Sequence, residues 1–74
     1  MSMSVDQTIA VSINGEHRRV VQKLSVAALV REIGFDPARV AVERNLEVVP
    51  RSQLGEVTVE DGDSYEIVRF VGGG

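Results

Sequence analysis

The sequence of 74 residues contains no cysteine, no tryptophan and only one histidine, His17. The absence of cysteine excludes disulfides, thiolate metal sites, iron–sulfur clusters and a cysteine nucleophile, and it suits a reducing cytosol. One histidine cannot build a histidine-rich metal site, and the carboxylates lack the spacing of a calcium loop, so we expect no metal. We expect His17 to be an exposed strand residue. Because neither a nucleophile nor an acid–base pair can be assembled, we expect no catalytic residues and no enzyme.

The chain also lacks a long apolar run and an excess of positive charge. Charged residues interrupt every hydrophobic segment, so none approaches the roughly 20 residues that span a bilayer. The residues from Met1 to Gln7 have neither the basic nor the apolar region of a secretory signal. Eight basic residues against eleven acidic ones give a net charge of −3, the wrong sign for binding a phosphate backbone. We therefore expect a cytoplasmic protein with no membrane and no nucleic-acid partner.

The first half of the chain predicts a β-hairpin. Ile9, Val11 and Ile13 alternate with smaller residues, which is typical of a half-buried strand. The pair at 14–15 is Asn-Gly, which supplies the two positive-φ positions of a type I′ turn. The run from His17 to Gln22 is therefore predicted to fold back as an antiparallel strand.

A short amphipathic helix is predicted after the hairpin. Ser25 can cap its first turn. One apolar stripe follows at helical spacing, formed by Val26, Leu29, Val30 and Ile33. Gly34 can adopt the left-handed conformation that ends a helix, and Pro37 prevents the helix from resuming. The helix is therefore predicted to stop near Ile33.

Two short strands are predicted next. Alternation resumes at Val40 and Val42, a turn is expected at 45–46, and a strand over 47–49 ends at Pro50. Proline inside a sheet is confined to edges because it cannot donate a ladder hydrogen bond. The strand before Pro50 is therefore predicted to lie at an edge of the sheet.

The final strand is predicted from Tyr65 to Val71, after an Asp-Gly-Asp turn at 61–63. The order of elements indicates an α+β domain, with one helix packed across one face of a mixed sheet of four to five strands. If the first strand pairs beside the last, the arrangement is a β-grasp. We assign residues 8–71 to this domain, 1–7 to a flexible extension and 72–74 to a flexible glycine tail.

The three terminal glycines, Gly72 to Gly74, are the main compositional break in the sequence. They precede no helix, so they do not form a phosphate-binding loop. One reading is a frayed terminus. The other is an active tail, because three extended residues without Cβ atoms reach roughly 10 Å and fit a narrow channel. A carboxylate reacts only after a good leaving group is attached, so a partner enzyme, plausibly one that uses ATP, would supply the chemistry.

Three segments carry a resemblance to a known family: VAVERNLEVVPRSQ over 40–53, DGD over 61–63 and FVGGG over 70–74. They resemble the ThiS family of sulfur carriers in thiamine biosynthesis, with a likeness that runs from about Ile9 to Gly74. The glycine ending alone is shared with the wider ubiquitin-like group, including the small subunit of molybdopterin synthase. Leu54 departs from the family pattern, which often has an aromatic residue there.

The resemblance implies a ubiquitin-like β-grasp fold and a defined chemistry at the chain end. A ubiquitin-activating-like adenylyltransferase of ThiF type would adenylate Gly74 with ATP, and a sulfurtransferase with a persulfide donor would convert it to a thiocarboxylate. The carrier would then donate the sulfur to a ThiG-type thiazole synthase. Gly72 and Gly73 would thread the partner's active site. The chain itself would bind no cofactor and would act as a protein co-substrate.

Docking on such partners should use exposed apolar side chains, and the candidates are Phe70, Val71 and Leu46. Each of them has an alternative reading as a core residue. An acidic segment precedes the last strand and could steer a basic partner or be a solvated turn. Its members are Glu56, Glu60, Asp61, Asp63 and Glu66. The same two readings apply to Arg51 and Arg69.

Two other functions stay open on the sequence alone. The first is the same carrier chemistry serving molybdopterin synthesis or another acceptor. That family often has prolines before its glycines, whereas residues 68–71 here contain none. The second is a β-grasp domain that binds a partner noncovalently and has an inert tail, which would keep its function after Gly73 and Gly74 are deleted.

Overall fold

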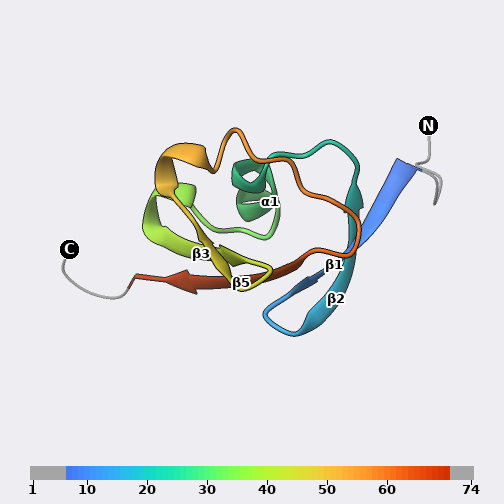
Figure 1. Cartoon of the computed structure of the whole chain (residues 1–74), viewed down its shortest axis with the longest axis horizontal. Coiled ribbons are helices and arrows are strands. Elements are labelled where there is room, and N and C mark those ends of the chain that lie inside the picture. Colours follow the sequence, from blue (N-terminus) through green and yellow to red (C-terminus); the bar gives the residue numbers. More distant parts are fainter. Residues whose placement is uncertain (1–6, 71–74) are drawn as a thin grey trace.

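The computed structural model describes residues 7–70 and contains one mixed sheet with one α-helix across it (Figure 1). The strands are β1 (Thr8–Ile13), β2 (Glu16–Val21), β3 (Val40–Arg44), β4 (Glu47–Val49) and β5 (Ser64–Arg69). The helix is α1 (Val26–Glu32), and two 3-10 helices, η2 (Pro37–Arg39) and η3 (Arg51–Gln53), flank β3 and β4. This confirms the predicted α+β fold with a five-stranded sheet. The glycine tail, and the N-terminal extension apart from Gln7, lie outside the described residues.

The predicted hairpin is confirmed. Asn14 has φ 51° and Gly15 has φ 85°, which are the two left-handed positions of a type I′ turn. β1 and β2 pair antiparallel from Thr8 opposite Val21 to Ile13 opposite Glu16. His17 is an exposed residue of β2, the outermost strand on this side of the sheet, as expected.

The helix also begins and ends where the sequence predicts. The hydroxyl of Ser25 accepts a hydrogen bond from the Ala28 amide at 3.0 Å, which satisfies one of the unpaired donors of the first turn. Gly34 follows the helix with φ 95°, a conformation that is unstrained for glycine. The stripe of Val26, Leu29 and Val30 is completely buried, at 0% exposure, so it packs α1 onto the sheet.

The first and last strands are neighbours at the centre of the sheet, whose order is β2-β1-β5-β3-β4. β5 pairs parallel with β1, with Ser12 opposite Ser64. On its other edge β5 pairs antiparallel with β3, from Val40 opposite Arg69 to Arg44 opposite Tyr65. The expected β-grasp arrangement is therefore confirmed, and it places the strand that leads to the C-terminus between two partners.

The C-terminal end of β4 agrees with the sequence prediction, and that of β5 does not. β4 is an edge strand and stops before Pro50, as predicted. β5 ends at Arg69, earlier than the predicted end at Val71. The reason lies in the neighbouring strand, because the residue beyond the last pair is Arg39, which belongs to η2 and does not continue the ladder. A single hydrogen bond, from the Phe70 amide to the Arg39 carbonyl at 3.0 Å, extends the pairing.

The core lies between α1 and the sheet face that it covers. Tyr65 is its largest completely buried side chain. The other buried apolar residues are Val11, Ile13, Val20, Val26, Ala27, Leu29, Val30, Val40, Val42, Leu54, Val59 and Ile67. Within residues 7–70, no helix is long and apolar enough to cross a bilayer.

Candidate functional site at the carboxyl end of β5

The strand that leads toward Gly74 is fastened on both edges by asparagine side chains as well as by backbone pairing. The Asn14 side chain donates to the Ile67 carbonyl at 3.1 Å and accepts from the Ile67 amide at 2.8 Å. The Asn45 side chain accepts from the Ser64 amide at 2.9 Å. The sequence identified both asparagines as turn residues only. Their side chains also hold β5 from the two turns that flank it, so the base of the C-terminal segment is fixed.

Four of the predicted site residues, Val71 and the glycines at 72–74, lie outside the described residues. Phe70 is the last residue described, and its side chain is 57% exposed. Phe70 is therefore not a core residue. It stands at the end of the fixed strand, directly before the residues in which the predicted chemistry resides.

Leu46, the third docking candidate, lies elsewhere. It is 90% exposed and follows β3 in the turn opposite the start of β5, since Arg44 pairs with Tyr65. Phe70 follows the other end of β5. The antiparallel register of β3 and β5 therefore separates Leu46 from Phe70 by the length of the strand, and the two do not form one patch. Leu46 also has φ 71°, a left-handed conformation that is strained for a branched residue.

The sequence did not single out two further exposed apolar residues on this half of the sheet. Val48 is 69% exposed and Val68 is 59% exposed. Val68 lies opposite the exposed Ala41 across the β3–β5 ladder, and both alternate with core residues, so they face away from α1. Strand alternation alone could have flagged them once the covered face was known.

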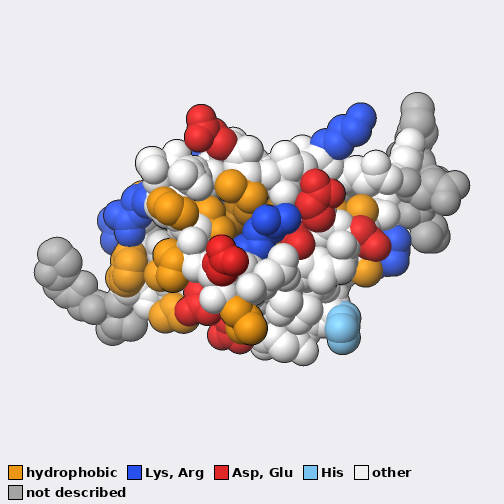
Figure 2. Space-filling model, in the orientation of Figure 1, with side chains coloured by type: hydrophobic (Ala, Val, Ile, Leu, Met, Phe, Trp, Pro, Cys, Tyr) orange, Lys and Arg blue, Asp and Glu red, His pale blue; other side chains and the backbone are white. Residues whose placement is uncertain are grey.

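Three arginines lie on the elements that meet at the end of β5. The guanidinium carbon of Arg51 lies 5.4 Å from the centre of the Phe70 ring. That of Arg69 lies 5.7 Å from the centre of the Phe35 ring. Arg39, whose carbonyl binds the Phe70 amide, has a side chain that is 80% exposed. Figure 2 shows basic and hydrophobic side chains gathered at the end of the molecule where β5 ends.

A hollow of about 260 Å³ lies beside Phe70 and Arg51, at the edge of the sheet that the short β4 leaves uncovered. Its wall is mostly apolar and is formed by Val40, Ala41, Val42, Val48, Val49, Pro50, Arg51, Leu54 and Phe70. A second hollow of about 310 Å³ continues past Arg51 toward Arg31 and Asp36. Arg51 therefore stands between two shallow depressions next to the end of β5.

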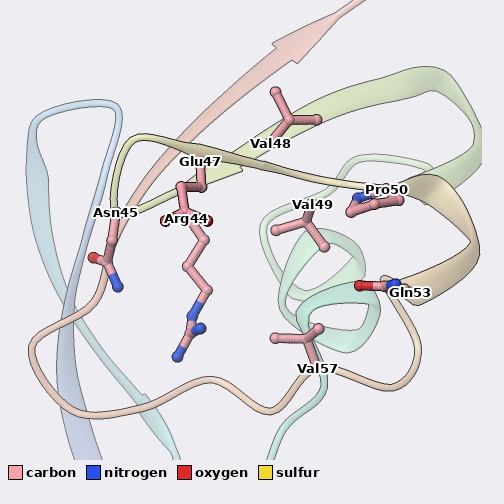
Figure 3. A pocket seen from close by; sticks show the side chains of 8 residues that line it. All are labelled: Arg44, Asn45, Glu47, Val48, Val49, Pro50, Gln53 and Val57. Carbon is pink, nitrogen blue, oxygen red and sulfur yellow. The ribbon is translucent and has the colours of Figure 1, made fainter.

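A third hollow, of about 250 Å³, opens between β4 and the segment that follows η3 (Figure 3). Its polar side chains are Arg44, Asn45, Glu47 and Gln53. Glu47 is the one carboxylate in this lining, and the lining holds neither histidine nor serine. It therefore offers no acid–base pair. Within residues 7–70, no three histidine, aspartate or glutamate side chains gather in a way that could hold a metal ion.

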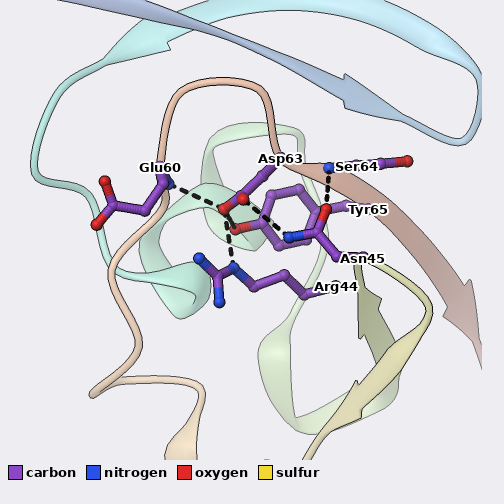
Figure 4. A network of polar contacts seen from close by, with 6 residues as sticks. All are labelled: Arg44, Asn45, Glu60, Asp63, Ser64 and Tyr65. Carbon is purple, nitrogen blue, oxygen red and sulfur yellow. Dashed lines mark hydrogen bonds and ion pairs between the residues drawn. The ribbon is translucent and has the colours of Figure 1, made fainter.

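A buried carboxylate, Asp63, is the centre of a polar network behind the β3–β4 turn (Figure 4). Asp63 is only 5% exposed. Its Oδ2 accepts from Arg44 Nε at 2.8 Å, from the Glu60 amide at 2.9 Å and from the Tyr65 hydroxyl at 2.8 Å. Its Oδ1 accepts from Asn45 Nδ2 at 3.0 Å. The network ties the turn after β3 to the loop that precedes β5.

The network keeps Asp63 ionised. Burial by itself would raise the pKa of Asp63, but the hydrogen bonds it accepts, led by that from the Glu60 amide, outweigh burial and hold its pKa below the ordinary value. The hydrogen bond to Asp63 raises the pKa of Arg44. Burial, and then the bond to Asp63, raises the pKa of Tyr65. Each group therefore stays in the charge state that the network needs.

These contacts change the reading of the acidic segment. Asp63 is buried and fully engaged, and Asp61 accepts a hydrogen bond from the Ala10 amide at 2.8 Å. Glu56, Glu60 and Glu66 are exposed. Two of the five acids therefore stabilise the loop before β5, and the segment is not a uniform free surface for steering a partner.

The model of the ThiS family matches residues 7–74. The chain belongs to the ThiS family. The match includes the whole described fold and continues through the terminal glycines, so the ThiS assignment rests on nearly the full length of the sequence.

Solved structures agree with the ThiS assignment. The crystal structure of the thiamine biosynthesis protein ThiS from Geobacter metallireducens is 33% identical and superposes with a TM-score of 0.75. The similarity covers 89% of this chain and 100% of that protein. A designed protein based on human erythrocytic ubiquitin superposes with a TM-score of 0.53 at 16% identity, covering 92% of this chain and 96% of that one. At that identity the likeness shows the ubiquitin-like fold alone.

Two kinds of curated relative are similar to this ThiS-family chain. A thiazole synthase of Paramagnetospirillum magneticum is 55% identical over 62 residues, which cover 84% of this chain and 19% of that protein. The chain thus spans about a fifth of that relative's length. The uncharacterized protein ycf40 of Porphyra purpurea is 31% identical over 70 residues, 95% of this chain and 99% of that protein.

Proposed function

We propose that this ThiS-family chain is a sulfur carrier of thiamine biosynthesis and that Gly74 carries the sulfur as a terminal thiocarboxylate. The observation that carries the proposal is the match of the family model through Gly74, combined with the position of β5. The likeness to a thiamine biosynthesis protein over that protein's whole length supports the pathway. On this proposal the chain is a co-substrate of partner enzymes.

The proposed chemistry begins at the carboxylate of Gly74. A carboxylate oxygen attacks the α-phosphate of ATP in a ThiF-type adenylyltransferase, pyrophosphate leaves, and an acyl-adenylate forms. The persulfide of a sulfurtransferase then displaces AMP. A thiol cleaves the resulting sulfur–sulfur bond and leaves the thiocarboxylate on Gly74. The chain needs no cofactor of its own, and the absence of cysteine removes a thiol that would attack the adenylate.

The geometry of the described residues supports delivery into another protein. β5 is held by strands on both edges and by Asn14 and Asn45, and the pairing ends with Phe70. Beyond Phe70 the sequence is VGGG, and four residues span at most about 14 Å when extended. A fixed base and a narrow end of that length suit a recessed active site that admits glycine but not larger residues.

A ThiG-type thiazole synthase is the proposed acceptor of the sulfur. Its support comes from proteins named thiazole synthase in two organisms. In Paramagnetospirillum magneticum a segment is 55% identical to this chain, and in Magnetococcus marinus a segment is 39% identical. When a carrier-like segment and a synthase belong to one polypeptide, the two act in close proximity. We therefore favour thiazole formation over molybdopterin synthesis as the step that this carrier serves.

Intact mass spectrometry tests the proposal. The purified chain is incubated with ATP, a ThiF-type adenylyltransferase, a sulfurtransferase charged with persulfide, and a thiol. We expect a mass gain equal to the replacement of one oxygen by sulfur, and no gain for the chain that lacks Gly74. The matched control is the substitution Glu66→Gln, which alters an exposed residue of β5 and should leave the gain unchanged.

The outcome separates the carrier from the alternatives. A mass gain without subsequent sulfur transfer to thiazole synthase would move the proposal to another acceptor, such as molybdopterin synthesis. An unchanged mass, with enzymes that form a thiocarboxylate on another carrier in the same assay, would favour a noncovalent binding domain. Deletion of Gly73 and Gly74 would then leave partner binding intact.

A further inference from the structure

We propose that Arg39, Arg51 and Arg69, named here the arginine collar, dock on an acidic surface around the active-site entrance of the adenylating partner. The inference rests on the proposed function, because it needs a partner that receives the chain end. It assigns a docking role to the three arginines, and their positive charge implies that the partner surface is negatively charged. That partner surface should present carboxylates around an apolar centre that accepts Phe70.

The collar residues belong to three elements that meet where β5 ends. Arg69 is the last residue of β5, Arg39 is the residue whose carbonyl holds the Phe70 amide at 3.0 Å, and Arg51 lies over the Phe70 ring at 5.4 Å. The three come from β5, η2 and η3, which are far apart in the sequence. Folding therefore brings three arginines to the end of β5, and one of them, Arg51, stacks on the exposed Phe70 ring.

The collar charges are available for a partner. The side chains of Arg51 and Arg69 are exposed, and within residues 7–70 neither forms an ion pair. Arg39 has only a contact of 3.7 Å with Asp36, between side chains that are 80% and 58% exposed. An ion pair of this length and exposure is weak. A carboxylate of a partner can therefore bind each guanidinium without first breaking a strong contact.

Stacking prepares two of the arginines for binding. Arg51 lies over Phe70 and Arg69 over Phe35, at 5.4 and 5.7 Å. An aromatic ring below the guanidinium plane restricts the side chain and leaves the N–H groups at the plane's edge free. Because less conformational entropy is lost on binding, a stacked arginine is a better anchor than a free one.

The sign of the collar is opposite to that of the whole chain. The net charge is −3, yet the three collar residues at the end of β5 are positive, and within residues 7–70 Asp36 is the one carboxylate that pairs with any of them. A local charge of this kind orients the molecule as it approaches a partner of opposite charge and repels a basic surface. An acidic rim on the adenylating partner would therefore guide the C-terminal end in first, while the exposed glutamates of the chain stay away from it.

The test measures pyrophosphate release by a purified ThiF-type adenylyltransferase that charges the wild-type chain. The variant Arg51→Glu/Arg69→Glu reverses two collar charges. Its matched control is Arg18→Glu/Lys23→Glu, which changes the net charge equally at exposed positions on and after β2. We expect kcat/KM to fall at least about tenfold for the collar variant and less than about twofold for the control.

Two further readouts guard against misfolding. Arg51→Gln/Arg69→Gln removes both charges but keeps polar side chains that can donate hydrogen bonds, and its kcat/KM should fall by several-fold, mainly through a higher KM. With the wild-type chain, kcat/KM should decline steeply as the salt concentration rises from low values, because screening weakens the attraction. The collar variants should show a shallower decline than the control, while circular dichroism spectra agree for all.

The outcomes separate the two proposals. If the wild-type chain is charged and the collar variants are charged equally fast with equal salt dependence, the docking assignment is wrong and the carrier function stands. If the control variant is impaired as strongly as the collar variant, net charge acts and the collar has no special role. If no adenylyltransferase charges the wild-type chain, the carrier function fails, and the collar loses its partner.

Discussion

Replacement of Asp63 by asparagine should destabilise the fold more than the corresponding amide substitution at any other acid of the segment before β5. Those other acids are Glu56, Glu60, Asp61 and Glu66. Oδ2 of Asp63 accepts three hydrogen bonds and its Oδ1 accepts one, from Asn45. If the new amide oxygen takes the place of Oδ2, its NH2 group must face Asn45 Nδ2, and two donors then oppose each other. The side-chain amide of Asn45 cannot flip by 180° to present its oxygen instead, because that oxygen accepts a hydrogen bond from the Ser64 amide at 2.9 Å.

The magnitude follows from these contacts. A buried donor without an acceptor costs about 1–3 kcal/mol. Replacement of the ionised acceptor of the Arg44 bond by a neutral amide oxygen removes about 1 kcal/mol more. The Arg44 side chain is 30% exposed, so water replaces part of that loss and the estimate stays near the lower half of the range. We expect a total of about 2–3 kcal/mol, which lowers the Tm of a chain this short by at least about 8 °C.

The assay is thermal unfolding followed by circular dichroism, with chemical denaturation as a second measure of the free energy of unfolding. Glu66→Gln is the matched control, since it removes the same charge from an exposed position on β5. Its Tm should stay within about 3 °C of the wild type. A Tm of Asp63→Asn that also stays within about 3 °C would refute the reasoning that the buried network stabilises this loop.

Three further changes test other features of the structure. Because the native pKa of Asp63 is depressed, the native state binds fewer protons than the unfolded chain, so stability is fully present above about pH 4 and falls as the pH drops below it. Urea midpoints between pH 6 and pH 2 should decline more steeply for the wild type than for Asp63→Asn. Leu46→Asn should raise the free energy of unfolding by roughly 0.5–1 kcal/mol, because asparagine tolerates the left-handed conformation at φ 71° and Leu46 is 90% exposed. A lower Tm for this variant would show that Leu46 contributes contacts that outweigh its strain. Asn14→Gly keeps the turn conformation but loses both bonds to Ile67, so stability should fall by about 1–2 kcal/mol. Equal unfolding midpoints for Asn14→Gly and the wild type would contradict this role.

Local patterns were sufficient to predict the hairpin and the helix. The Asn14-Gly15 pair specifies its own backbone angles, and Ser25 and Gly34 mark the two ends of α1. Each of these signals acts within a few residues, so a sequence read in order contains it. The placement of β1 beside β5 needed one more step, the expected β-grasp arrangement, and the parallel pairing confirms it.

The parts that the sequence did not predict depend on residues that meet only after folding. Asp63 looked like one acid among five, and its burial follows from contacts with Arg44 and Asn45 on another turn. β5 ends at Arg69 because η2, which directly precedes the neighbouring strand β3, does not continue the ladder. The arginine collar likewise joins three separate elements. The charge and turn propensity of a residue can be read from its neighbours in the sequence. The contacts of Asp63, β5 and the arginines depend instead on which residues the strand pairing brings together.

The central position of β5 also has a mechanical consequence. β1 and β5 run parallel as neighbours, so the chain enters and leaves this pair at opposite ends. A force that pulls the two ends apart loads the hydrogen bonds between β1 and the start of β5 in shear, instead of breaking them one at a time as in peeling; these bonds run from the Ser12 amide to the Asp63 carbonyl and from the Asn14 amide to the Tyr65 carbonyl. A partner that pulls on the C-terminal end would therefore meet resistance from both neighbouring strands, and the fold should stay intact under that load.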